Sequence, residues 1–400
     1  MSARITPYAI AVPATALATL QKKLSLASLP GETSQSEEWE YGAPRNDIKR
    51  LVEHWQTKFD WRHAESELNK LPQFTTNISV EGHESLQIHF VHKKSSSPKS
   101  IPLLFCHGWP GSFVEVAKIL PLLSAGDDEP SFHVVAPSLP NFGFSQRTSK
   151  IGFGIRQHAE VCHKLMIELG YSKYVTQGGD LGFFVTRAMG ELYPESILGS
   201  HLNFIVTKPP SPISSPLLIL QYLTGWLTSH EKDGLKRTQE YNDSGSGYRH
   251  IQQSRPHTIG FALADSPVAL LAWIYEKLHD WTDNYSWTDD EVLTWVSIYL
   301  FSSAGPESSV RIYHDLMNPK ADINMGILLK YNKVSLGISY FPRDVVVLPS
   351  SWGRTLGPVV FEKRHAEGGH FAAHEKPELL VQDIKAFVQK LNISATLTGK

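Results

Sequence analysis

A single acidic residue stands among glycines at the end of a short β-like run. Asp180 lies in Gly178-Gly179-Asp180-Leu181-Gly182, after Tyr174–Thr176 and before a helix-like run from Phe183 to Leu192. Small residues on both sides of one reactive residue are what a strained strand-to-helix turn, a nucleophile elbow, requires. A carboxylate at this point attacks a saturated carbon that carries a leaving group and forms an alkyl ester. The pattern therefore predicts Asp180 as a nucleophile for epoxides or alkyl halides.

The position of Asp180 at the start of a helix also bears on its charge. The free N–H groups and the dipole of a helix stabilise a carboxylate at its N-terminus. We therefore expect Asp180 to be ionised at neutral pH, as a nucleophile must be. A structural N-cap residue occupies the same position, so the elbow taken alone leaves both interpretations open.

A second glycine-rich turn follows another buried strand candidate, Ile101–Cys106. In α/β-hydrolases the turn at this strand end supplies one N–H group of the oxyanion hole, and the residue after the nucleophile supplies the other. In the segment from His107 to Ser112 these donors would be the backbones of Trp109 and Leu181. They would stabilise the negative oxygen that forms when the ester is hydrolysed. The peptide bond before Pro110 is one that could be cis.

A histidine near the C-terminal end completes a catalytic triad in the chain order nucleophile, acid, histidine. His370 lies in Glu367-Gly368-Gly369-His370-Phe371, before the last helix, and would act as a general base on water. Asp344 follows the predicted strand Leu336–Tyr340 and would orient the imidazole. Glu362 and Glu367 are alternative candidates for the acid.

No metal site is expected in this part of the chain. His365, His370 and His374 lie close together in the sequence, and the last two have a spacing found in metal-binding pairs. The two glycines before His370 interrupt any helix, and no further ligand set stands out. We expect no metal and no organic cofactor, with His365 and His374 in structural or solvated positions.

The elements that would position these residues alternate between strand and helix. Residues 1–100 form an N-terminal extension that ends in a β-hairpin over 76–94, and residues 101–207 form the first part of an α/β core with a mostly parallel sheet. The alternation stops at Pro209, Pro210 and Pro212. Residues 208–330 then read as an all-helical cap, and residues 331–400 as the second part of the core.

Composition excludes several classes of function. The 400 residues carry a formal net charge of −2, which argues against a nucleic-acid-binding surface. The two cysteines cannot form a disulfide framework, and no targeting or membrane-spanning segment is convincing, so a cytoplasmic location is the expectation. The expected partners are a small molecule and water, without nucleic acid or a membrane anchor. A homodimer contact through exposed parts of the N-terminal extension is left open.

Over nearly its whole length the chain resembles the microsomal-type epoxide hydrolases. The core motifs match in order at the segments from His107 to Ser112, from Gly178 to Gly182 and from Gly368 to Ala372, together with Pro140-Asn141-Phe142-Gly143-Phe144-Ser145. Three segments of the N-terminal region match as well, namely Trp39-Glu40-Tyr41-Gly42, Phe59-Asp60-Trp61-Arg62 and the segment from Leu71 to Thr75. Without an N-terminal anchor, the chain looks more like the soluble fungal members.

The resemblance implies roles for two tyrosines of the cap. Tyr248 and Tyr313 stand where the family holds and protonates the epoxide oxygen, and with Trp109 they would contact the substrate. The implied activity is cofactor-independent hydrolysis of an epoxide to a vicinal diol, in a detoxifying or a biosynthetic role. Two alternatives are a haloalkane dehalogenase-like hydrolase, which needs halide donors instead of paired tyrosines, and a hydrolase-like binding protein without turnover.

The chain departs from the family pattern at two positions. Leu181 stands where many members have Trp, and because only its backbone is needed, we expect a change in pocket shape rather than a loss of activity. Asp344 stands where many have Glu, and either carboxylate can orient a histidine. The aromatic motifs around Trp39, Tyr41 and Trp61 are expected to pack against the core and the cap in a structural role.

Overall fold

The computed structural model describes residues 5–126, 130–208, 216–318 and 321–391. The prolines at 209, 210 and 212, at which the sequence pattern changes, lie outside these described residues, as do the last nine residues of the predicted second core segment.

A nine-stranded sheet forms the centre of the molecule, with the strand order β1-β2-β3-β5-β4-β6-β7-β8-β9. Neighbouring strands from β5 to β9 in this order run parallel, whereas β1, β2 and β3 are antiparallel to their neighbours. This confirms the predicted α/β-hydrolase core with a mostly parallel sheet. The strands are Thr6–Pro7 (β1), Gln73–Ser79 (β2), Ser85–Lys93 (β3), Ile101–Cys106 (β4), Phe132–Pro137 (β5), Tyr174–Gly178 (β6), Ile197–Leu202 (β7), Leu336–Tyr340 (β8) and Val359–Arg364 (β9).

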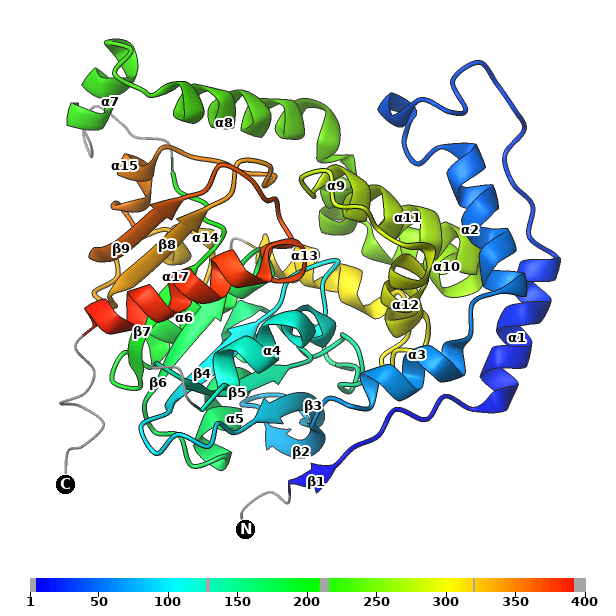
Figure 1. Cartoon of the computed structure of the whole chain (residues 1–400), viewed down its shortest axis with the longest axis horizontal. Helices are drawn as coiled ribbons and strands as arrows, with labels where there is room; N and C mark the ends of the chain where they lie inside the picture. The colour runs from blue at the N-terminus through cyan, green and yellow to red at the C-terminus, as the bar shows by residue number, and fades with distance from the viewer. Residues whose placement is uncertain (1–4, 127–129, 209–215, 319–320, 392–400) are drawn as a thin grey trace.

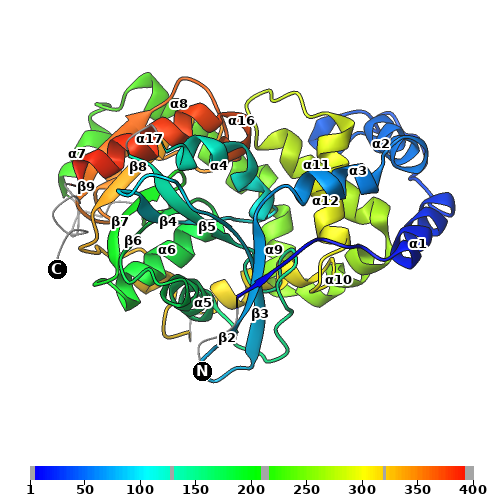
Figure 2. The ribbon, with the colours of Figure 1, turned by 60° about the horizontal axis from the view of Figure 1, so that its bottom comes forward.

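Helices cover both faces of this sheet, with α4, α16 and α17 on one face and α5 and α6 on the other (Figure 2). Every residue of β4 and β6 is buried, as a parallel sheet covered on both faces requires. The register pairs Cys106 with Gly178, so the turns that follow these two strands lie next to each other. The core helices are Val116–Ser124 (α4, after a 3₁₀ turn at Phe113–Glu115), Ile155–Glu168 (α5), Leu181–Leu192 (α6), Ser350–Gly353 (α15), Ala372–Glu375 (α16) and Pro377–Lys390 (α17).

Between β7 and β8 the described residues are helical, and they lie beside and above the sheet (Figure 1). Within the expected helical cap, the sequence pattern predicts helices over Leu217–Leu227, Pro267–Trp281, Asp289–Phe301 and Ser308–Met317, and the structure has α7, α11, α12 and α13 in these places. No helix was predicted at α8, because its residues are almost all polar and show no apolar period. The cap elements are Pro216–Leu223 (α7), Ser229–Glu240 (α8), a π turn at Tyr241–Gly245, Gly247–Ser254 (α9), Pro256–Asp265 (α10), Pro267–Asp280 (α11), Asp289–Leu300 (α12), a 3₁₀ turn at Ser308–Arg311, Ile312–Leu316 (α13) and Met325–Leu328 (α14).

The N-terminal helices pack along the outer side of the cap (Figure 1), and they are Ala14–Ser25 (α1), Arg45–Thr57 (α2) and Trp61–Leu68 (α3), with a 3₁₀ turn at Trp39–Tyr41. Trp39 stacks on His279 of the cap with 3.5 Å between ring centroids, and Trp61 is buried against Phe301. The expectation for Tyr41 is wrong, since its side chain is 71% exposed. It lies at the end of a short turn from which only Trp39 reaches a partner.

A membrane-spanning helix must be both long and apolar. No single helix among the described residues is long and apolar enough to span a membrane. Helices α10 and α11 meet both conditions only when taken as a pair, and that pair is bent by 115°.

Candidate active site

The turn after β6 holds Asp180 in a strained backbone conformation. Its φ of 48° and ψ of −120° lie outside the regions that non-glycine residues prefer. The neighbouring glycines make this turn possible, because a Cβ at Gly178 would come within 2.5 Å of the Gly182 carbonyl oxygen. A Cβ at Gly182 would come within 2.0 Å of the Cys106 carbonyl oxygen. The described geometry is that of a nucleophile elbow, with the Asp180 side chain presented at the carboxyl ends of the strands.

The turn after β4 lies directly against this carboxylate. The Trp109 backbone N–H donates to Asp180 Oδ1 at 2.8 Å, and the Leu181 N–H bonds to the same side chain. A Cβ at Gly108 would come within 2.4 Å of Asp180 Cβ, so only glycine permits this approach. The peptide bond between Trp109 and Pro110 is cis. The two backbone donors predicted for an oxyanion hole therefore both lie against the Asp180 carboxylate.

His370 lies on the other side of Asp180. Its Nε2 is 3.8 Å from Asp180 Oδ2, and its Nδ1 is 2.7 Å from Asp344 Oδ1. An isolated parallel bridge between Arg343 and Gly369 places the acid and histidine loops side by side. The backbone N–H of His370 donates to the Trp281 carbonyl oxygen at 2.7 Å, which fixes the loop against the cap. The three residues predicted as a triad are thus adjacent, with Asp344 and His370 buried and the Asp180 side chain 15% exposed.

The alternative acids lie elsewhere. Glu362 pairs with Arg354 on the exposed edge strand β9, and Glu367 pairs with Lys376. Neither carboxylate contacts His370 in the structure, so Asp344 is the acid that the geometry offers.

Burial and neighbouring charges act in opposite directions on these groups. Burial raises the pKa of Asp180, while His370 and the N–H groups of Trp109 and Leu181 oppose that rise. Burial alone would lower the pKa of His370. The charge and hydrogen bond of Asp344, together with the charges of Asp180 and Glu115, outweigh it and raise that pKa to about 9. The imidazole is therefore protonated at neutral pH in the resting site, between two carboxylates.

Aromatic rings from the cap close the site above Asp180. Trp109 stacks on Tyr248 with 5.1 Å between centroids and meets Tyr313 edge-on at 5.7 Å. Both tyrosines are buried, and burial raises the pKa of each well above its ordinary value. The Tyr313 hydroxyl makes no regular hydrogen bond with any described residue. Both hydroxyls therefore keep their protons at neutral pH and can donate them.

A cavity of about 560 Å³ leads from Asp180 to the surface of the cap. Its buried wall is apolar, with Leu181, Phe184, Phe204 and Leu316. Its outer part is polar, with Gln239, Asn242, Arg249, His250 and Gln253. Leu181 lies in the wall of this cavity, so its expected effect on pocket shape stays a prediction. The cavity is large enough for a drug-sized apolar molecule.

Within the described residues, no group of three or more His, Cys, Asp or Glu side chains is placed to hold a metal ion. His365 pairs with Asp383 at 2.6 Å, and His374 lies 3.3 Å from Glu291, so these two histidines have structural partners.

Comparison with known proteins identifies the family. Residues 5–116 match the family model described as epoxide hydrolase N terminus, and residues 101–229 match that of the alpha/beta hydrolase fold. Epoxide hydrolase 1 of Sus scrofa is 36% identical over 376 residues, which cover 87% of this chain and 81% of that protein. The chain belongs to the epoxide hydrolase family.

Solved structures of epoxide hydrolases agree with this assignment. The Aspergillus niger epoxide hydrolase superimposes with a TM-score of 0.84 at 34% identity and covers 98% of this chain and 97% of its own. The juvenile hormone epoxide hydrolase of Bombyx mori superimposes with a TM-score of 0.88 at 26% identity and covers 99% of this chain and 96% of its own. The N-terminal extension and the cap therefore belong to the shared epoxide hydrolase architecture.

Sequence reasoning missed several residues of this epoxide hydrolase site. The Tyr241 hydroxyl lies 2.9 Å from that of Tyr248, and the Trp281 ring lies 5.0 Å from the His370 ring. Glu115 is a buried carboxyl close enough for its charge to act on Asp180 and His370. Glu115 lies four residues beyond the glycine-rich turn, and this spacing was the one available signal.

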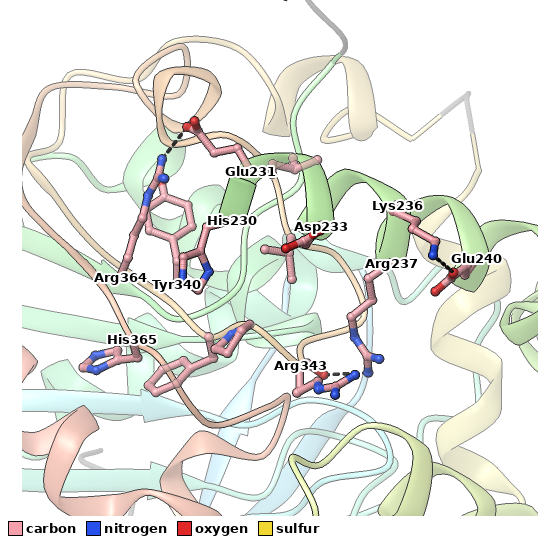
Figure 3. A pocket seen from close by; sticks show the side chains of 15 residues that line it. His230, Glu231, Asp233, Lys236, Arg237, Glu240, Tyr340, Arg343, Arg364 and His365 are labelled. Carbon is pink, nitrogen blue, oxygen red and sulfur yellow. Dashed lines mark hydrogen bonds and ion pairs between the residues drawn. The ribbon is translucent and has the colours of Figure 1, made fainter. Parts of the chain in front are cut away.

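Arg237 was also missed, because it lies on α8. Its Nε donates to the Asp344 carbonyl oxygen at 2.7 Å, and its Nη2 donates to the carbonyl oxygens of Arg343 and Asp280 at 2.7 and 3.0 Å. Figure 3 shows this side chain pointing from the helix toward Arg343, in a pocket of about 370 Å³ behind the acid loop. One cap side chain thus joins the acid loop to the end of α11.

Proposed function

We propose that this epoxide hydrolase family member converts epoxides to vicinal diols through an alkyl ester on Asp180. The observation that carries the proposal is the setting of the Asp180 carboxylate. Oδ1 accepts from the Trp109 backbone N–H, Oδ2 lies near His370, and two buried tyrosines stand in the wall of the same cavity. A carboxylate in this position fits attack on carbon rather than a structural N-cap role, because it makes no capping hydrogen bond to the N–H groups one or two residues beyond Leu181 in α6.

In the first step Asp180 opens the epoxide ring. Oδ1 already accepts from the Trp109 N–H, so Oδ2 is the oxygen that bonds to the ring carbon, and Oδ1 becomes the ester carbonyl. The ring oxygen gains charge as its carbon–oxygen bond breaks. Tyr248 and Tyr313 would donate hydrogen bonds to it and supply its proton, which is general acid catalysis. Paired phenols suit an alkoxide better than a halide, which favours epoxide over alkyl halide chemistry.

In the second step water attacks the ester carbonyl carbon. Alkylation removes the negative charge of Asp180, one of the charges that keep His370 protonated. The imidazole can then lose its proton to solvent and serve as the base for water, held in orientation by Asp344, and it takes up a proton again when the Asp180 charge returns. The oxyanion forms at Oδ1, where the N–H groups of Trp109 and Leu181 stabilise it. No cofactor takes part in either step.

The apolar inner cavity favours lipophilic epoxides as substrates, with the ring at Asp180 and the hydrocarbon part along Phe184 and Phe204. The polar outer part would receive a more hydrophilic end of the molecule.

A single turnover in water labelled with heavy oxygen tests the covalent step. With enzyme in excess over an aryl epoxide, the first turnover should place the label in the peptide that contains Asp180 and leave the diol unlabelled. The reason is that water attacks the ester carbonyl carbon and not the epoxide. Peptide mass spectrometry reads the label. Asp180→Ala should form no diol above the background reaction. A labelled diol from the first turnover, or equal turnover by the variant, would exclude the ester mechanism.

A further inference from the structure

Glu115 is a buried carboxyl group beside the catalytic residues that the two-step mechanism leaves without a role. It ends the 3₁₀ turn that follows the glycine-rich motif, and its Oε1 is buried without a hydrogen-bond partner among the described residues. The backbones of Ser112 and Gly108 donate to the carboxyl. A buried carboxyl that only stabilises a fold has its oxygens paired, because an unpaired buried oxygen costs about 1–3 kcal/mol.

A small cavity adjoins this carboxyl. It has a volume of about 20 Å³, and Glu115, Asp180, His370 and Gln177 all line it. Gln177 also has a buried, unpaired oxygen, Oε1, while its amide nitrogen donates to Asn203. A cavity of this volume is enough for one water molecule, which needs two to four polar partners. Unpaired acceptors and both reacting groups thus surround a space of the right size.

The glycine-rich motif makes room for the carboxyl. A Cβ at Gly111 would come within 1.7 Å of Glu115 Oε1, so any other residue there would force the carboxyl out of its place. Glycine at position 111 therefore leaves room for the Glu115 carboxyl, and glycine at position 108 leaves room for the Asp180 side chain.

We propose that Glu115, assisted by Gln177, holds the water molecule that hydrolyses the Asp180 ester. The inference rests on the ester mechanism proposed above and assigns it a water-holding residue. Glu115 Oε1 and Gln177 Oε1 accept hydrogen bonds from the water, and its lone pair is directed at the ester carbonyl carbon. Burial and the charge of Asp180 raise the pKa of Glu115 to about 7, against the opposing effect of His370, so its charge is coupled to both reacting groups.

Every atom of the water molecule is accounted for in the hydrolysis of the ester. The water oxygen bonds to Asp180 Cγ while one water proton passes to His370 Nε2. The bond from Cγ to the diol oxygen then breaks, and His370 returns that proton to the diol oxygen. The second water proton leaves the regenerated Asp180 carboxyl and replaces the proton that a cap tyrosine gave to the ring oxygen.

The test is Glu115→Gln, which keeps the size of the side chain but places an amide donor at the cavity. Rapid mixing with an excess of an aryl epoxide, acid quenching and intact-protein mass spectrometry give the rates of ester formation and decay. We expect decay to slow by about 10- to 100-fold while formation changes less than about threefold, so the ester accumulates. Glu160→Gln is the matched control, since Glu160 is a buried carboxylate that binds Lys164 and the Glu81 backbone.

Ester decay at the wild-type rate in Glu115→Gln would overturn the proposal, as would equal slowing of formation and decay. Gly111→Ala provides a second route to the same answer if Glu115→Gln does not fold. It displaces the carboxyl without removing it, and the same selective slowing is expected. If the wild type itself forms diol without any ester, the proposed mechanism fails, and this outcome is distinct from failure of the Glu115 assignment.

Discussion

His370 carries a proton in the resting site that it must lose before it can activate water. Burial disfavours the charged imidazole, but Asp344, Asp180 and Glu115 together raise its pKa to about 9. The resting arrangement therefore pairs a cation with the nucleophile, and ester formation removes one of the negative charges. On this mechanism the first chemical step prepares the base for the second.

The protonation state of His370 predicts how the rate of ester hydrolysis depends on pH. Because neutral His370 is the base, the rate of ester decay should rise with pH. Its midpoint should lie below about 9, since the ester lacks the Asp180 charge that helps to raise the pKa in the free site. Single-turnover decay measured between about pH 6 and 10 checks this. A decay rate that falls as pH rises over this interval would contradict the assignment of His370 as the base.

At the scale of elements, α8 holds the acid loop through one side chain. Arg237 donates to three carbonyl oxygens, those of Arg343, Asp344 and Asp280. The residue after Asp280 is Trp281, whose own carbonyl oxygen accepts from the His370 backbone. A movement of α8 would therefore reach the acid and the histidine at the same time.

Arg237→Ala should lower the free energy of unfolding by about 2–4 kcal/mol, because three carbonyl oxygens lose a charged donor. It should also slow ester decay, because the loop that carries Asp344 is no longer fixed. Urea unfolding and single-turnover kinetics measure the two effects. Lys236→Ala is the control on the same helix. Lys236 is exposed and, among the residues that the structure describes, pairs with exposed Glu240 alone, so we expect a change within about 0.5 kcal/mol. Equal effects of the two substitutions would refute the role of Arg237.

At the scale of the whole molecule, the N-terminal extension joins the sheet, the core and the cap. β1 pairs with β2 at the sheet edge, and Trp39 stacks on the cap. Trp61 packs on Phe301 and donates to the buried Glu65, which also accepts from the Val12 backbone. The extension therefore contributes to the stability of a site to which it gives no catalytic residue.

Substitutions of two aromatic residues in this extension should have very different effects on the free energy of unfolding. Trp61→Ala removes a buried ring and should lower the free energy of unfolding by about 3–5 kcal/mol. Tyr41→Ala removes a ring that is 71% exposed and should change it by less than about 0.5 kcal/mol. Urea unfolding followed by tryptophan fluorescence and by loss of diol formation gives both values. Similar losses in the two variants would show that the exposed turn packs differently in solution.

The residues that follow strands could be predicted from the sequence, and those contributed by polar cap helices could not. Asp180, Asp344 and His370 each follow a recognisable strand, and a parallel sheet brings such turns to one edge. Arg237 and Tyr241 lie on or directly after α8, whose polar residues carry no period that would reveal a helix. Trp281 contacts His370 only because the cap folds over the core, and local sequence does not encode that contact.

The two halves of the proposed reaction come from different parts of the chain. The phenols for ring opening belong to the helical insertion, whereas the groups that act on water belong to the strand-end loops. Substitutions in the insertion that spare Arg237 can therefore change which epoxides are accepted, and how fast they react, while the regeneration of the enzyme stays intact. Descendants of such a protein can diversify their substrates by exchanging this insertion, provided that each new one keeps a basic side chain in the place of Arg237.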